Sequence, residues 1–353
     1  MSKKIREVRI GNLKIGGDNP VMVQSMCNTD TCDTKATINQ ILALEKEGCE
    51  AIRVAVPTME ATFFLKEIKK NINIPLIADI HFDYKIALEA IKQGIDKLRI
   101  NPGNIGDENK IKKLIKACKE NNIPIRIGVN GGSLEKDLLE KYNHQASAEA
   151  LVESALKHIQ ILEEQQFYNI VVSLKSSDVK TTVQAYKKLR KIVDYPLHIG
   201  VTEAGTLKIG TVKSCIGLGG LLLDGIGETL RVSLTANPVH EVRLAWDILK
   251  SLKLRKRGVS LTSCPGCGRT KINLEKIANQ VEEYCHNIKT NLHIAVMGCV
   301  VNGVGESSHA DIGIIGGGNK VALYEKGQFL FSVPEKEAFI AVKKIIDKYI
   351  KTV

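Results

Sequence analysis

The chain has 353 residues, 44% of them hydrophobic and 25% charged, and no apolar run approaches the roughly 20 residues of a membrane span. Its start has no signal-peptide core, so we expect a cytoplasmic protein with no membrane partner. The net charge is +11 with only 5% aromatic residues, too few for stacking on bases, so we expect an acidic small molecule as the partner and no nucleic acid.

Residues 20–235 repeat one unit, which consists of an apolar strand, a polar turn and a helix with apolar residues at three-four spacing. The pattern predicts eight strands, at Val21–Met26, Ala51–Val56, Pro75–Ile80, Lys97–Asn101, Pro124–Val129, Asn169–Lys175, Pro196–Glu203 and Glu228–Leu234. Strands so rich in Val and Ile indicate a parallel sheet covered by helices, and eight units close a TIM (β/α)8 barrel. A doubly wound open sheet is the alternative, but the glycine fingerprint that usually follows its first strand is absent here.

The remaining residues predict a second, smaller domain of the α+β class. A barrel domain at 1–250 is expected to bind the substrate, and the basic segment at 251–258 is expected to be a hinge. In the domain at 259–353, helices are expected at Ile272–Asn287 and Glu335–Ile350, with strands and a hairpin between them.

Five of the predicted barrel strands carry a cation among apolar neighbours. These cations are Arg53, Arg99, Arg126, Lys175 and Arg231. Alternation places each on the inward face, near the strand ends where barrel enzymes build their active sites. Toward the carboxyl ends of the eight predicted strands, the carboxylates are only Asp79 and Glu203. Because unpaired buried charge is costly and arginine binds phosphate oxygens bidentately, we expect a phosphate ester or diphosphate to occupy the site.

Polar residues end several of these strands. His81 and Asn101 follow the third and fourth strands, and Thr202 and Glu203 close the seventh. A carboxylate beside cations stays ionised and is well placed for proton transfer, so Glu203 is the candidate general acid or base. His198 lies deeper in its strand and is interpreted as a structural, hydrogen-bonded group.

Three cysteines in the second domain indicate a metal centre. Cys264-Pro-Gly-Cys267 directs two thiolates at one point, and Cys299 adds a third from a glycine-rich loop that runs to Glu306. Structural zinc sites are normally closed by four Cys or His ligands. An incomplete thiolate set suits an iron–sulfur cluster that reacts at an exposed iron, so the sequence predicts a redox enzyme.

Taken together, these motifs resemble the 4-hydroxy-3-methylbut-2-enyl diphosphate synthase family, flavodoxin- or ferredoxin-dependent enzymes of the methylerythritol phosphate route to isoprenoids. The segments that carry the resemblance are Val23–Met26, Ile52–Pro57, Ala78–Phe82, Leu98–Gly103, Arg126–Gly131, His198–Gly205, Ser263–Arg269 and Met297–Glu306. The length is similar to that of the compact bacterial type.

The resemblance implies reductive ring opening and dehydration of 2-C-methyl-D-erythritol 2,4-cyclodiphosphate, with two electrons delivered singly through a 4Fe-4S cluster. It implies that the cluster is held by Cys264, Cys267, Cys299 and an exchangeable Glu306. It further implies that Glu203 handles protons and that the substrate is bound by Arg53, His81, Arg99, Asn101, Arg126, Asn130, Lys175, Thr202, Arg231 and Ser233. A homodimer is implied, in which the barrel of one chain meets the cluster domain of the other.

Two alternatives to this interpretation stay open. One is a zinc-stabilised, anion-binding module, in which Cys285, His286 or His293 joins the three cysteines. The other is a barrel synthase of the pterin-binding kind, which would use the same cationic mouth without a redox cluster.

Overall fold

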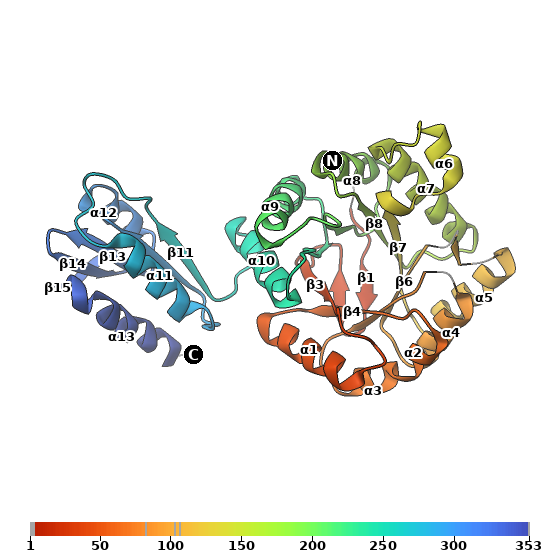
Figure 1. Cartoon of the computed structure of the whole chain (residues 1–353), viewed down its shortest axis with the longest axis horizontal. Coiled ribbons are helices and arrows are strands. Elements are labelled where there is room, and N and C mark those ends of the chain that lie inside the picture. Colours follow the sequence, from red (N-terminus) through yellow and green to blue (C-terminus); the bar gives the residue numbers. More distant parts are fainter. Residues whose placement is uncertain (1–3, 82, 102–103, 106, 352–353) are drawn as a thin grey trace. The chain divides into compact units, whose positions relative to one another are not determined.

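The computed structural model describes residues 4–81, 83–101, 104–105 and 107–351, so Phe82, Pro102 and Gly103 of the motifs above lie outside the described residues. The chain divides into two compact units, Met1–Arg255 and Lys256–Val353 (Figure 1). The division falls within the segment 251–258. Among the described residues, no helix is long and apolar enough to cross a membrane.

The first unit is built on an eight-stranded parallel sheet in the order β8-β7-β6-β5-β4-β3-β10-β9. Its strands are β3 (Met22–Met26), β4 (Ala51–Ala55), β5 (Leu76–Asp79), β6 (Lys97–Ile100), β7 (Ile125–Asn130), β8 (Ile170–Lys175), β9 (His198–Ile199) and β10 (Thr229–Leu230). A parallel bridge between Val172 and Leu197 joins the two ends of this order. The predicted TIM barrel is therefore confirmed, although β9 and β10 are much shorter than the sequence pattern indicates.

Helices cover the outside of the barrel (Figure 1). They are α1 (Thr34–Glu47), α2 (Met59–Phe63), α3 (Leu65–Lys70), α4 (Tyr84–Lys92), α5 (Glu108–Glu120), α6 (Lys136–Lys141), α7 (Ala148–Glu164), α8 (Val179–Ile192), α9 (Leu207–Leu223) and α10 (Pro238–Ser251). Their ends follow from the sequence: in α1, Asp33 accepts a hydrogen bond from the Ala36 N–H, and Gly48 ends the helix with a φ of 100°.

A short antiparallel hairpin precedes the barrel. It consists of β1 (Val8–Ile10) and β2 (Leu13–Ile15). Its buried side chains pack against Met22, Ala51, Ile77 and Val171, which lie at or near the starts of barrel strands. The hairpin therefore closes the N-terminal end of the barrel with an apolar layer, and the polar interior lies beyond it.

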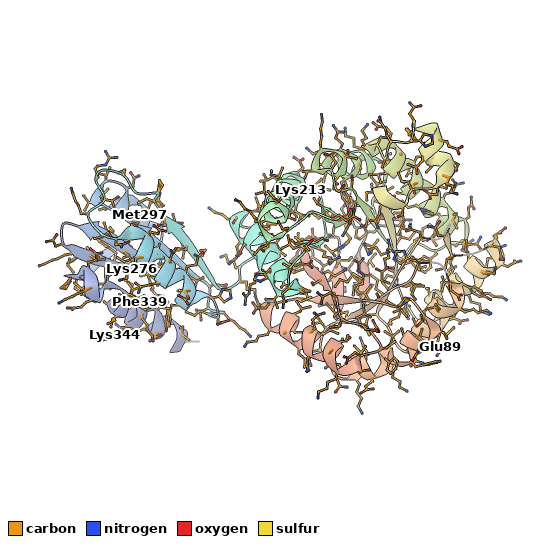
Figure 2. The ribbon with its side chains drawn as sticks, viewed as in Figure 1. Glu89, Lys213, Lys276, Met297, Phe339 and Lys344 are labelled. Carbon is orange, nitrogen blue, oxygen red and sulfur yellow. The ribbon has the colours of Figure 1, made fainter. Side chains whose placement is uncertain are left out.

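The second unit is a mixed sheet in the order β11-β12-β13-β14-β15. The strands β11 (Val259–Ser263), β12 (Leu292–Met297) and β13 (Ile312–Gly317) are parallel, and β14 (Lys320–Glu325) and β15 (Gln328–Pro334) complete the sheet in antiparallel pairing. Helices α11 (Leu274–Cys285) and α13 (Ala338–Lys351) share one apolar core with the sheet. Lys276 and Lys344 lie on the exposed sides of these two helices (Figure 2).

A third helix of this unit, α12 (Val300–Ser308), covers residues that the sequence pattern indicates as a loop. Gly303 allows it to pack closely, because a Cβ at this position would lie 2.6 Å from Ile315. Glu306 therefore belongs to a helix and not to a glycine-rich loop.

Candidate active site

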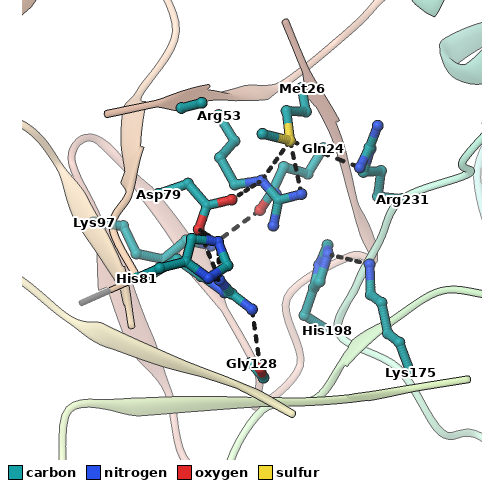
Figure 3. A network of polar contacts seen from close by, with 12 residues as sticks. Gln24, Met26, Arg53, Asp79, His81, Lys97, Gly128, Lys175, His198 and Arg231 are labelled. Carbon is teal, nitrogen blue, oxygen red and sulfur yellow. Dashed lines mark hydrogen bonds and ion pairs between the residues drawn. The ribbon is translucent and has the colours of Figure 1, made fainter. Parts of the chain in front are cut away.

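The cations predicted from the strands lie inside the barrel, on β4, β6, β7 and β8 and directly after β10. Arg53, Lys175 and Arg231 can be followed in Figure 3. Arg53, Arg99, Arg126 and Lys175 are buried, and Arg126 is only 1% exposed. Arg231 directly follows β10 and is partly buried. Five strand positions spread over the sequence are thus collected in one interior space, as alternation within the strands predicts.

Asp79 is shared among several of these cations. Its carboxylate lies 3.0 Å from Nη1 of Arg99, 3.5 Å from Nε of Arg53 and 3.4 Å from Nε2 of His81. Burial alone would raise the pKa of Asp79, but the guanidinium groups of Arg53 and Arg99 outweigh it and lower that pKa to about 2. Asp79 is therefore a fixed negative charge that holds the arginines in place.

Two glycines make room for the cations. A Cβ on Gly128 would lie 2.4 Å from Nε of Arg99, and a Cβ on Gly200 would lie 2.8 Å from Nζ of Lys175. The Gly128 carbonyl also accepts a hydrogen bond of 3.0 Å from Nη2 of Arg99. Glycines in strands often mark such close approaches, and here they belong to the site.

Lys97 is a site residue that the sequence argument missed. It begins β6, it is fully buried, and its Nζ donates a hydrogen bond of 3.1 Å to Oε1 of Gln24. Burial, with repulsion from Arg126 and Arg53, lowers the pKa of Lys97 well below its usual range. The sequence did carry a signal, because Lys97 lies two residues before Arg99 and therefore on the same, inward face of the strand.

Lys175 contacts a neutral imidazole deep in the barrel. Its Nζ lies 3.3 Å from Nε2 of His198, whose Nδ1 lies 2.8 Å from Oγ1 of Thr229. Burial, reinforced by Lys175, lowers the pKa of His198 well below its usual range. His198 is thus a hydrogen-bonded interior group, as its position in the strand predicts.

Arg231 is paired with a carboxylate from outside the barrel strands. Its Nε and Nη2 lie 3.3 Å from Oε2 of Glu241, a buried residue in the first turn of α10. The sequence argument missed Glu241 because it lies on a helix. A charged residue on the apolar face of α10 was the available signal.

Positive charge exceeds negative charge in this interior. Among the described residues, the cations are Arg53, Lys97, Arg99, Arg126, Lys175 and Arg231, and the carboxylates that contact them are Asp79 and Glu241. Even with both lysines neutral, four arginines face two carboxylates, because arginine stays protonated in proteins. Nε and Nη2 of Arg126 are buried without a hydrogen-bond partner. Such an arrangement suits a multiply charged anion with several oxygens.

The predicted polar residues surround this space at different depths. Oδ1 of Asn101 accepts a hydrogen bond of 2.9 Å from the Gly128 N–H, and His81 lies next to Asp79 and Arg99 with about half of its side chain exposed. Asn130 ends β7, and Thr202 and Ser233 follow β9 and β10; all three are partly exposed. Glu203 is exposed and has a φ of 50°, which is rare for a residue other than glycine.

In the second unit, the loops that carry the three predicted cysteines adjoin at one edge of the sheet. Cys264 follows β11, and Cys299 lies between β12 and α12. The Gly298 N–H donates a hydrogen bond of 3.3 Å to Sγ of Cys264, which ties the two loops together. Oγ1 of Thr270 accepts a hydrogen bond of 3.0 Å from the Cys267 N–H.

All three cysteines are free thiols with partial or full exposure. The Arg269 N–H, with help from its guanidinium group, lowers the pKa of Cys267 and favours the thiolate that binds metals. Soft donors on two adjoining loops fit an iron–sulfur cluster, whose separate iron atoms take separate ligands.

Glu306 stands apart from the cysteines. It is exposed near the end of α12, roughly 10 Å along the helix axis from Cys299 at 1.5 Å per residue. Within the described part of the chain, no three His, Cys, Asp or Glu side chains converge on a point where a single metal ion could bind. Of the residues suggested for a zinc site, Cys285 is buried in the apolar core and His293 lies 2.8 Å from Oγ1 of Thr262.

Comparisons with known proteins cover both units. A family model described as the GcpE TIM-barrel domain matches residues 5–246, and one described as the GcpE protein C-terminal domain matches residues 260–348. The chain is 57% identical over 351 residues to the 4-hydroxy-3-methylbut-2-en-1-yl diphosphate synthase (flavodoxin) of Caldanaerobacter subterraneus subsp. tengcongensis, with 99% of each chain covered. It is 55% identical over 348 residues to the protein of the same name from Fusobacterium nucleatum, with 99% of this chain and 98% of the relative covered.

Solved structures of other enzymes share the barrel. A dihydropteroate synthase of Xanthomonas albilineans, in complex with indole-2-carboxylic acid and 6-chloroguanine, aligns with a TM-score of 0.50 and 13% identity. The alignment covers 70% of this chain and 97% of that one. At this identity, the similarity shows the fold alone.

Proposed function

The chain belongs to the GcpE family, and on that premise we propose that it is an iron–sulfur oxidoreductase that makes 4-hydroxy-3-methylbut-2-enyl diphosphate from 2-C-methyl-D-erythritol 2,4-cyclodiphosphate. The reaction takes up two electrons and two protons, opens the cyclic diphosphate and releases one water. It is a step of the methylerythritol phosphate route to isoprenoids. The observation that carries the proposal is the excess of buried cations in the barrel, which a diphosphate would balance.

In this proposal, the barrel unit binds the substrate. The diphosphate oxygens would take the hydrogen bonds and charge of Arg53, Arg99, Arg126, Lys175 and Arg231. The carbon skeleton and its hydroxyl groups meet the polar residues around the space, which are His81, Asn101, Asn130, Thr202 and Ser233. The unpartnered nitrogens of Arg126 support this, because a phosphate would provide the acceptors that they lack.

The second unit would hold the cluster through Cys264, Cys267 and Cys299, with Glu306 as the fourth ligand. A 4Fe-4S cluster, when bound, supplies electrons one at a time and an iron that accepts an oxygen ligand. Glu306 would give the ligand set one exchangeable oxygen donor beside three thiolates.

The chain's own residues would direct the protons and the leaving group. The arginines would stabilise the phosphate oxygen that is released as the ring opens, since their charge is held in place before the reaction. Asp79 has a pKa of about 2 and is bound to Arg99, so it is a poor acid at neutral pH. Glu203 lies at the exposed rim and is the proposed proton donor to the departing hydroxyl.

The proposed partners are an electron donor and a second copy of the chain, in the cytoplasm. Flavodoxin is the donor in the names of the relatives, and ferredoxin would serve the same chemistry. The helix α9 exposes an apolar stripe of Ile209, Val212, Ile216 and Leu223. This stripe supports a homodimer, because large exposed apolar surfaces usually mark interfaces.

Anaerobic purification tests the proposed function. We expect equal amounts of iron and sulfide, a brown chromophore, and turnover of the cyclodiphosphate with a chemical reductant. Cys299→Ala leaves the barrel intact and should abolish turnover. Turnover that survives this change would favour a barrel synthase of the pterin-binding kind, and zinc in place of iron would favour the zinc module.

A further inference from the structure

The strand β3 contributes two inward residues to the site that the proposed function leaves without a role. Gln24 and Met26 alternate on this strand and belong to the Val23–Met26 motif. Gln24 is 1% exposed, and Met26 is partly buried nearer the open end of the barrel. Both side chains lie among the cations in Figure 3.

Each of these residues accepts hydrogen bonds from cations of other strands. Oε1 of Gln24 lies 3.1 Å from Nζ of Lys97. Sδ of Met26 lies 3.1 Å from Nε and 2.8 Å from Nη2 of Arg53, and 3.8 Å from Nη1 of Arg231. One strand thus contacts cations from β4 and β6 and the one that follows β10.

Both acceptors are uncharged, and this distinguishes them from the carboxylates of the site. Asp79 and Glu241 orient arginines and also cancel part of their charge. An amide oxygen or a thioether sulfur orients a cation and leaves its charge intact, because it adds no negative charge of its own. Nε2 of Gln24 is buried without a partner, so Gln24 retains a free donor as well.

We propose that Gln24 and Met26 are positioning residues, which orient Lys97, Arg53 and Arg231 through neutral acceptors and so keep the positive charge of the pocket available for a diphosphate. The identity of the substrate rests on the proposed function. The proposal predicts that the affinity for diphosphate depends on Gln24 and Met26 being uncharged. This affinity can be measured without turnover.

Gln24→Glu is the main test, because it changes the charge and barely changes the shape. The new carboxylate pairs with Lys97 and repels the ligand, so we expect the dissociation constant for inorganic diphosphate to rise about tenfold or more. The same pair supplies the counter-ion that buried Lys97 lacks, so the midpoint of thermal unfolding should stay the same or rise. Gln184→Glu is the control, because Gln184 lies on the exposed side of α8 and this variant has the same net charge as Gln24→Glu. It should leave the affinity for inorganic diphosphate unchanged.

Met26→Leu tests the second residue at nearly constant volume. Without the sulfur, Arg53 keeps its ion pair with Asp79 but loses the neutral acceptor that orients it. We therefore expect KM for the cyclodiphosphate and the dissociation constant for inorganic diphosphate to rise about threefold or more with little change in kcat. Met22→Leu is the matched control, because Met22 lies on the same face of β3 but packs in the apolar layer.

The decisive pattern is weaker binding without loss of stability. Wild-type affinity for inorganic diphosphate in Gln24→Glu would overturn the proposal, as would affinity and stability falling together or a wild-type protein that does not bind diphosphate. If Gln24→Glu fails to fold, unchanged binding in Met26→Leu overturns it. A wild-type protein that binds diphosphate in this Gln24-dependent way but does not turn over the cyclodiphosphate would refute the proposed function and leave this inference standing.

Discussion

Glu203 is held in a backbone conformation that its side chain does not favour. Its φ of 50° lies in the left-handed region, which costs a residue with a Cβ about 1–2 kcal/mol. Such strain persists where the position of the side chain matters, and it is concentrated at functional sites. The exposed carboxylate at the rim of a cationic pocket is therefore consistent with a role in the reaction rather than in folding.

Replacement of Glu203 should separate activity from stability. Glu203→Gln removes the proposed proton donor, and we expect kcat to fall about 100-fold or more. Glu203→Gly should lose as much activity as Glu203→Gln, but it should unfold at the same or a higher temperature. Glycine adopts this φ without strain, so the free energy of unfolding should rise by up to about 1 kcal/mol. Kinetics with a chemical reductant and thermal unfolding measure both effects. A glycine variant with full activity would remove Glu203 from the mechanism.

Asp79 should make stability depend on pH in the acid range. Its pKa is lowered from 3.8 to about 2 in the folded protein, so its contribution is complete above pH 4 and is lost as the pH falls toward 2. We expect Asp79→Asn to lower the free energy of unfolding by about 2 kcal/mol at pH 7, and the gap to the wild type to close below pH 4. Denaturant titrations at several pH values measure it. Asp137→Asn, which removes an exposed pair with Lys157, should have little effect at any pH. A constant gap would show that Asp79 acts by packing alone.

At the scale of single residues, the sequence predicts the site residues that follow from strand alternation. It does not predict those that reach the site through packing between distant elements. Arg53, Arg99 and Arg126 were predictable because each interrupts an apolar strand. Lys97 was missed because a lysine at the first position of a strand is usually solvated, although its alternation with Arg99 places it on the buried inward face. Glu241 was hidden because its partner Arg231 lies on a different kind of element.

Among the elements, the loops that carry the cysteines depend on a close approach of the Gly298 backbone to the Thr270 side chain. A Cβ on Gly298 would lie 2.8 Å from Oγ1 and 2.9 Å from Cγ2 of Thr270. We therefore expect Gly298→Ala to push the loops apart and to lower the iron and sulfide content of the purified protein. Gly317→Ala, at the same edge of the sheet with open space around it, should retain the full content. Equal iron in both variants would show that the loops do not need this contact.

The helix α12 joins Cys299, the proposed thiolate ligand at its start, to the carboxylate of Glu306 near its end. If Glu306 is the exchangeable ligand, Glu306→Cys should retain the cluster and lose most of the activity, because a thiolate holds iron more firmly than a carboxylate does. Iron and sulfide analysis reports the cluster, and turnover with a chemical reductant reports the reaction. Full activity in this variant would show that no ligand exchange occurs at Glu306.

Sequence periodicity is sufficient to predict some of the helices and strands but not all of them. The eight strands and most helices follow from it, because a parallel barrel repeats one local pattern. The strand β9 ends after Ile199, where Gly200 leaves space for Lys175, so the apolar run overstated its length. The helix α12 was missed because its valines and glycines favour other structures, and packing against Ile315 decides its conformation.

The whole molecule has two functional units in one chain, and a short connection joins them. Arg255 is fixed to the barrel unit: its guanidinium group donates hydrogen bonds of 2.6 Å to the Val21 carbonyl and 2.9 Å to Glu50, and lies over the Trp246 ring. Val21 and Glu50 precede β3 and β4, so this anchor is at the end of the barrel opposite to the cationic mouth.

Mixed dimers test the homodimer that the family resemblance implies, in which the barrel of one chain meets the cluster domain of the other. We would co-express Glu203→Gln, which inactivates the barrel, with Cys299→Ala, which inactivates the cluster, under different tags and purify the heterodimer. If sites form between chains, one of the two sites combines an intact barrel with an intact cluster, and activity should be about half that of the wild type. Each homodimeric variant should be inactive. A heterodimer without activity would place both halves of the site in the same chain, because every site would then carry one of the two changes.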